Sequence, residues 1–134
     1  MPVPDYVMFH DGVVERITMS ADQLDIELAR LCVYKEEGPK KFGVWAAKAV
    51  LRATGIHSLA IIGAVAREHD RISSGEVMSR TGIELVDIDE LKSIEEGTIT
   101  LLFTQSAARL HCRAKSVSLT IVDPGKRFES FTDE

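Results

Sequence analysis

Acidic residues between positions 84 and 96 form the densest group of side chains that could take part in binding. Six carboxylates lie within 13 residues, against one cation, Lys92; they are Glu84, Asp87, Asp89, Glu90, Glu95 and Glu96. A solvated strand face with its following turn would present them without any function, whereas a negative patch would speed the encounter with a basic partner. The ligand spacing and the glycine of an EF-hand calcium loop are missing. We therefore predict that these six residues bind a basic protein.

Two histidines stand beside residues with which they could share chemistry. His10 precedes Asp11, as a base precedes its orienting carboxylate, and His111 precedes Cys112, a pair of potential zinc ligands. Adjacent residues on a strand point to opposite faces, so neither pair should converge. With Gly12 after it, the first pair is typical of a turn into a strand. Zinc needs about four converging ligands, and their usual spacing is missing. We predict no metal site, no cofactor and no catalytic residues.

Catalysis by residues that meet only in the fold stays open at this point. There is no G-x-S-x-G nucleophile motif, and Gly63 lacks the neighbouring glycines of a phosphate-binding loop. A nucleophile and its base, however, meet in space and not along the chain. The alternative to a non-catalytic binding protein is therefore a small enzyme or ligand-binding protein with a pocket lined by His10, His57 or His111.

Length and composition predict one globular domain, residues 1–134. Apolar residues make up 45% and charged residues 28%, and the net charge of −5 argues against a nucleic-acid partner. No apolar stretch reaches the roughly 18–20 residues of a membrane span, and no secretory signal opens the chain. Two isolated cysteines, Cys32 and Cys112, should be reduced and buried. We expect a cytoplasmic protein without membrane contact.

Alternating apolar residues in the last third of the chain predict antiparallel strands. The runs are 98–103, 109–114 and 116–121, followed by the turn residues Asp123-Pro124-Gly125. Residues 13–19 and 24–28 flank a short polar break at 20–22 and predict another hairpin. We expect a mostly β protein, with antiparallel sheets in a sandwich or an open, barrel-like arrangement.

The segments 21–34 and 40–53 fit helices as well as strands, because their apolar residues satisfy both spacings. The alternative fold is therefore α+β, with helices near 21–34 and 40–53. Residues 67–75 are polar and predict an exposed loop, and residues 84–90 alternate as a strand would. Trp45, the only tryptophan, fits either a core position or an interface anchor.

Three segments resemble a loose group of small bacterial β-rich proteins. They are Phe9–Val14, Val50–Ile61, and Thr98–Phe103 followed by Leu110–Arg113. Several families of this look are proposed immunity proteins against polymorphic toxins. The resemblance implies a β-rich fold and neutralisation of a toxin by protein–protein contact; it supplies no catalytic residues. Gly12 and the Ala-rich segment 42–53 depart from the pattern. A homo-oligomer that pairs β edges is the remaining alternative.

Overall fold

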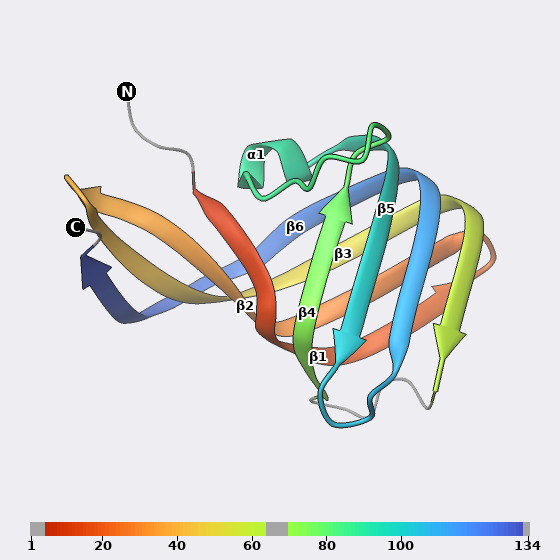
Figure 1. Cartoon of the computed structure of the whole chain (residues 1–134), viewed down its shortest axis with the longest axis horizontal. Helices are drawn as coiled ribbons and strands as arrows, with labels where there is room; N and C mark the ends of the chain where they lie inside the picture. The colour runs from red at the N-terminus through yellow and green to blue at the C-terminus, as the bar shows by residue number, and fades with distance from the viewer. Residues whose placement is uncertain (1–4, 64–69, 133–134) are drawn as a thin grey trace.

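Six long antiparallel strands form one sheet that closes into a barrel, in the order β1-β2-β3-β6-β5-β4 (Figure 1). The structure, a computed structural model, describes residues 5–63 and 70–132, with side chains as far as residue 127. The strands are β1 (Tyr6–Ser20), β2 (Gln23–Gly38), β3 (Lys41–Ile62), β4 (Asp70–Met78), β5 (Ile94–Phe103) and β6 (Arg109–Thr132), and α1 (Ile88–Leu91) is a single helical turn. The mostly β prediction is confirmed.

β3 changes its neighbours along its length, and this creates the edge discussed below. Its residues 41–54 pair with both β2 and β6, whereas residues 56–62 pair with β6 alone. The change occurs at Gly55, whose φ of +66° is open to glycine at little cost. Asp22 anchors the corner: its carbonyl oxygen accepts from the Gly55 amide at 3.1 Å, and its carboxylate accepts from the Ile56 amide at 2.9 Å. In Figure 1 the last part of β3 runs beside the start of β6, β5 and β4 in the front layer.

The interior is filled by the apolar residues that alternate along each strand. In β5, Ile99, Leu101 and Phe103 are at most 1% exposed, while Thr98 and Thr100 face outward. Residues 109–114 of β6 alternate in the same way. Both cysteines are buried free thiols, as the sequence predicts.

The α+β alternative, with helices near 21–34 and 40–53, is wrong, because these segments lie in β2 and β3. Ala47, Ala49, Leu51 and Ala53 are at most 2% exposed and point into the barrel. Hydrogen bonding to neighbours on both sides outweighs the weak strand preference of alanine here.

The last third of the chain forms fewer separate strands than the sequence predicts. Residues 109–114 and 116–121 are not two strands of a meander but parts of one strand, β6. Asp123-Pro124-Gly125 is a bulge within it, where the register shifts between Lys48↔Asp123 and Ala46↔Lys126. β6 pairs only with β3 at this point, so the missing proline N–H leaves no ladder bond unmade. The hairpin around residues 20–22 is confirmed as β1 and β2.

The exposed loop predicted for residues 67–75 is wrong from residue 70 onward, because β4 begins there; residues 67–69 lie outside the described residues. Asp70 is fully buried and pairs with Val14, which joins β4 to β1 and closes the barrel. Its carboxylate accepts from the Gln105 amide at 3.1 Å and from the Ser106 hydroxyl at 2.7 Å. Residues 84–90 form two isolated bridges and the start of α1, not a strand. No helix in the described chain is long and apolar enough to cross a membrane.

Candidate functional site

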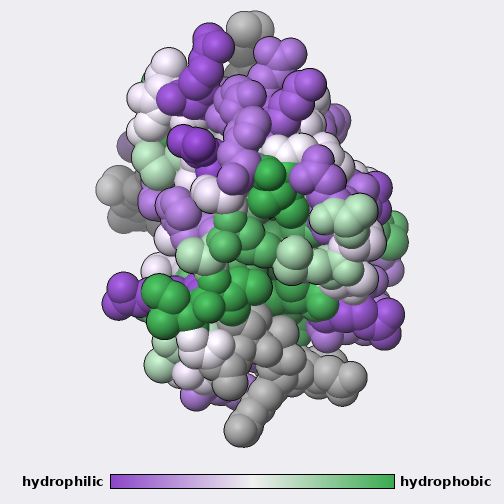
Figure 2. Space-filling model, turned by 90° about the vertical axis from the view of Figure 1, so that its right-hand side faces the viewer, coloured by the Kyte–Doolittle hydropathy of each residue, from purple (hydrophilic) through white to green (hydrophobic). Residues whose placement is uncertain are grey.

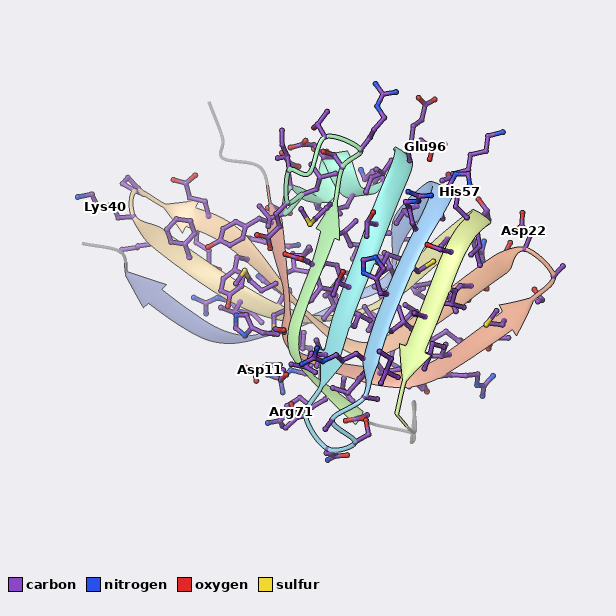
Figure 3. The ribbon with its side chains drawn as sticks, turned by 45° about the vertical axis from the view of Figure 1, so that its right-hand side comes forward. Asp11, Asp22, Lys40, His57, Arg71 and Glu96 are labelled. Carbon is purple, nitrogen blue, oxygen red and sulfur yellow. The ribbon has the colours of Figure 1, made fainter. Side chains whose placement is uncertain are left out.

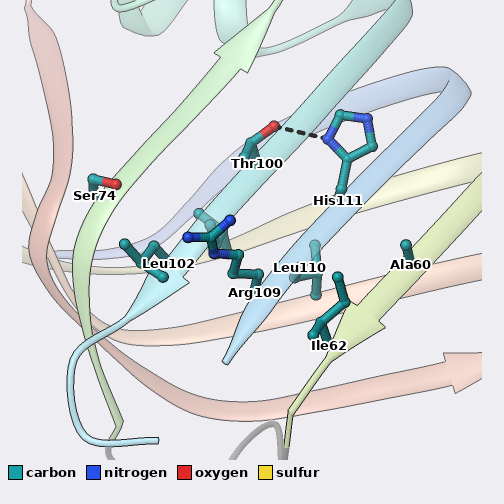
Figure 4. A pocket seen from close by; sticks show the side chains of 9 residues that line it. Ala60, Ile62, Ser74, Thr100, Leu102, Arg109, Leu110 and His111 are labelled. Carbon is teal, nitrogen blue, oxygen red and sulfur yellow. Dashed lines mark hydrogen bonds between the residues drawn. The ribbon is translucent and has the colours of Figure 1, made fainter. Parts of the chain in front are cut away.

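A groove crosses the outer face of the front layer, and we call it the central groove. Its volume is about 410 Å³. The side chains that give it its character are Ala60, Ile62, Ser74, Leu102, Arg109 and His111, from β3, β4, β5 and β6 (Figure 4). These strands face the groove with residues that alternate with core residues. The sequence pattern therefore identifies the outward residues, but only the strand order brings them together.

Polar groups gather at one part of the central groove. The Thr100 hydroxyl and His111 Nδ1 lie 3.1 Å apart, which leaves Nε2 of the imidazole facing outward. In Figure 4 the Arg109 side chain extends across the groove toward Leu102. Within the described chain, Arg109 makes no ion pair. The groove thus combines an available cation with apolar walls.

The histidines of the predicted pocket do not meet. His10 lines one hollow, His111 the central groove and His57 a third, so no two described histidines share a cavity. His10 Nδ1 does lie 3.3 Å from Asp11 Oδ2, contrary to the prediction that these neighbours point apart. Asp11 has a φ of +64° at an irregularity within β1, and this turns its side chain toward His10. His111 and Cys112 point to opposite faces, as the strand period requires.

Three of the six predicted partner-binding carboxylates have local partners. Asp87 is the N-cap of α1 and accepts from the Asp89 amide at 2.8 Å. The Asp89 carboxylate lies 3.0 Å from Lys92 Nζ, although both side chains are largely exposed. Glu96 Oε2 lies 2.9 Å from His57 Nε2. The Asp87 contact caps α1, and the ammonium of Lys92 offsets part of the negative field around Asp89.

The other three carboxylates, Glu84, Glu90 and Glu95, are exposed. Together with Asp87, Asp89 and Glu96 they lie on the connection from β4 to β5 and at the start of β5, at one end of the front layer (Figure 1). We call these six residues the acidic segment. Glu96 at its end lies beside His57 on β3 (Figure 3).

The last part of β3 presents an open strand edge that the sequence did not identify. Beyond Ile56, no described strand pairs with the side of β3 that faces away from β6. Ile61 and Ile62 are 40% and 67% exposed, and Leu59 packs partly against the core. We call residues 57–62 the β3 edge. Figure 2 looks at this side of the molecule and shows apolar surface across its centre.

Natural proteins usually protect such an edge with charged residues, prolines or bulges. Residues 57–62 hold no lysine, arginine, acid or proline, and His57 is their only ionisable side chain. The apolar run from Leu59 to Ile62 is visible in the sequence. That one side of it lacks a neighbour follows only from the strand order.

Trp45 packs against the core cluster while remaining partly exposed. The ammonium of Lys35 lies 4.7 Å from its ring centroid. Its indole N–H is buried and has no hydrogen-bond partner among the described residues. Trp45 is therefore a core residue with part of its side chain exposed to solvent.

Comparison with protein-family models, curated proteins and solved structures finds no match to this chain. The resemblance to immunity-like proteins therefore stays a prediction, and function is inferred from the geometry above.

Proposed function

We propose that the protein is a non-catalytic binding protein that takes an extended segment of a partner protein onto the β3 edge. The unpaired, apolar course of residues 57–62 is the observation that carries this proposal. An extended segment can add to an exposed sheet edge through main-chain hydrogen bonds, while its alternate side chains meet the two faces of the sheet.

The side chains of the β3 edge favour an apolar segment. Ala60 and Ile62 point to the outer face, where they line the central groove. Leu59 and Ile61 alternate with them on the opposite face, where Leu59 packs against the core cluster and Ile61 stays 40% exposed. A partner strand with apolar residues on both faces would cover all four, and burial of such surface contributes about 25 cal/mol per Å².

The surroundings of the β3 edge favour a partner with basic residues at one end. Asp22, His57 and Glu96 lie at the same end of the barrel (Figure 3). The acidic segment continues from Glu96 toward α1 and would speed the approach of a basic protein. A basic toxin is the partner that the resemblance implies, and neutralisation would then consist of covering it stoichiometrically.

Selection of displayed random peptides on the immobilised protein tests the edge. We expect the wild-type protein to enrich extended apolar sequences with a Lys or Arg near one end. Ile61→Lys places a charge on the edge and should abolish this enrichment. Val122→Lys is the matched control, because Val122 is also an exposed apolar residue of a strand, at 65%, but lies on β6. Equal enrichment on the Ile61→Lys variant, or none on any of the three proteins, would overturn the proposal.

Charge reversal tests the acidic segment separately. Glu90→Lys with Glu95→Lys should slow association with a selected basic peptide and leave its dissociation rate nearly unchanged. These two residues are preferable to Asp87, because loss of the Asp87 cap would unwind α1 as well. Glu15→Lys is the control, because Glu15 is exposed on β1. An unchanged association rate would mark the segment as a solvated surface only.

The competing occupant of the β3 edge is a second copy of the chain. Light scattering of the purified protein separates the two. A dimer that Ile61→Lys converts to a monomer would assign the edge to self-association and refute a foreign partner there.

A further inference from the structure

We propose that the central groove binds an organic carboxylate with an apolar chain, a ligand of the fatty-acid type. This inference goes beyond the proposed function and does not depend on it. The carboxylate would lie at Arg109, and the chain would run over the apolar side chains of the groove, Leu102, Ala60 and Ile62.

Arg109 supplies the charge complementarity. Its guanidinium makes no ion pair within residues 5–63 and 70–132, in a protein whose net charge is negative. A planar guanidinium offers paired N–H donors that match the two oxygens of a carboxylate. The anionic end of a ligand would therefore find an available bidentate partner in the groove.

His111 lies two residues from Arg109 on the same strand and adds a second polar group to the lining of the groove. When the Thr100 hydroxyl donates to Nδ1, the neutral imidazole carries its proton on Nε2, the nitrogen that faces outward. The Ser74 hydroxyl lines the same groove from β4.

The walls select for the apolar chain. Ile62 is 67% exposed without a ligand, so covering it removes apolar surface from water. A volume of about 410 Å³ falls within the range of about 300–1,000 Å³ typical of small-molecule sites. An inorganic anion would leave the walls exposed, and a hydrocarbon would leave Arg109 without an acceptor. A ligand with a carboxylate and an apolar chain would both pair with Arg109 and cover the apolar walls.

Isothermal titration calorimetry with octanoate, octanol and acetate tests the proposal. We expect octanoate to bind about three- to tenfold more tightly than octanol, because one partly exposed charge-assisted contact separates them. Acetate should bind far more weakly than octanoate. Arg109→Gln should remove the preference for octanoate over octanol, whereas Arg16→Gln on β1 should preserve it.

A second pair of variants separates the groove from the β3 edge. Ile62→Ser should weaken octanoate and octanol alike, because Ile62 lines the groove. Ile61→Ser should change neither, because Ile61 is its exposed neighbour on the same strand but does not line the groove. Absent octanoate binding, an unaltered preference in Arg109→Gln, or equal loss in Ile61→Ser would each overturn the inference. Arg109→Gln lies outside the β3 edge and should leave peptide enrichment unchanged, so the two proposals fail separately.

Discussion

Replacement of Asp70 by alanine should be one of the most destabilising polar substitutions in this protein. The carboxylate is fully buried and accepts two hydrogen bonds, from the Gln105 amide and the Ser106 hydroxyl. The Ser106 hydroxyl in turn accepts from the Ala108 amide at 3.2 Å, so the network holds the whole turn between β5 and β6. The same residue closes the barrel by pairing with Val14 on β1.

The expected loss follows from those contacts. A hydrogen bond to a charged group contributes about 1.5–3 kcal/mol, so two of them give about 3–6 kcal/mol. Gln105 is exposed, and water can replace part of its bond; we therefore expect about 2–4 kcal/mol for Asp70→Ala. Asp70→Asn keeps one acceptor oxygen and should lose about half as much. Glu15→Ala, at an exposed acid of β1, should change the free energy of unfolding by less than about 0.5 kcal/mol.

Urea unfolding at pH 7, followed by the fluorescence of Trp45, measures these differences. A double-mutant cycle with Ser106→Ala should give a coupling energy of about 1 kcal/mol or more, because the two side chains share a bond. Loss of less than about 1 kcal/mol in Asp70→Ala, or strict additivity with Ser106→Ala, would refute the assignment of the network.

Three further outcomes test other parts of the fold. The bidentate hydrogen bonds from Arg52 hold the pKa of Asp25 below its usual range. Asp25→Asn should therefore lower the free energy of unfolding by less than about 1 kcal/mol at pH 7. In urea titrations the difference in unfolding free energy between this variant and the wild type should disappear as the pH falls below about 4, because the wild-type carboxylate becomes protonated. Gly125→Ala should lower the unfolding free energy by more than about 1 kcal/mol at a φ of +71°, whereas Gly38→Ala, where an added Cβ has room, should cost less in the same assay. Burial raises the pKa of the Cys112 thiol, so mass spectrometry should find it alkylated by iodoacetamide far more slowly in native protein than in urea; equal rates would contradict its burial.

The parts of the fold that could be predicted are those in which one strand face is buried and the other wet. β5 is the clearest case, because Ile99, Leu101 and Phe103 fall on one buried face and Thr98 and Thr100 fall on the other. β3 could not be assigned in this way. Its alanines satisfy both periods, and only the bonds to β2 and β6, which are distant in sequence, decide between helix and strand.

Proline and glycine residues gave a wrong prediction of a turn where a bulge within a strand accommodates them. Pro124 and Gly125 fit a bulge on a strand paired on one side as well as they fit a turn. The polar neighbours of Asp70 in the sequence predict an exposed loop, yet the groups that donate hydrogen bonds to its carboxylate come from the turn after β5.

The candidate sites show the same limit. Arg109 and His111 could be assigned to an outward face from their alternation with core residues. Their position opposite Ile62 depends on β3 lying beside β6, and the open edge depends on nothing lying beyond it among the described strands. Neither relation is encoded in local spacing.

The pairing of β3 with β6 along almost their whole lengths also bears on how the chain folds. Lys41 pairs with Thr132 and Ile62 with Arg109, so the longest ladder of the sheet joins segments that are far apart along the chain. Such nonlocal contacts require large loops to be closed before they contribute any stability, and they slow folding. The β1–β2 hairpin can form early, but β3 lacks its main neighbour until β6 has been synthesised. During that interval β2 can cover one side of residues 41–54, but the side of β3 that faces β6 and all of residues 56–62 stay unpaired, so the risk of aggregation is highest for the nascent chain.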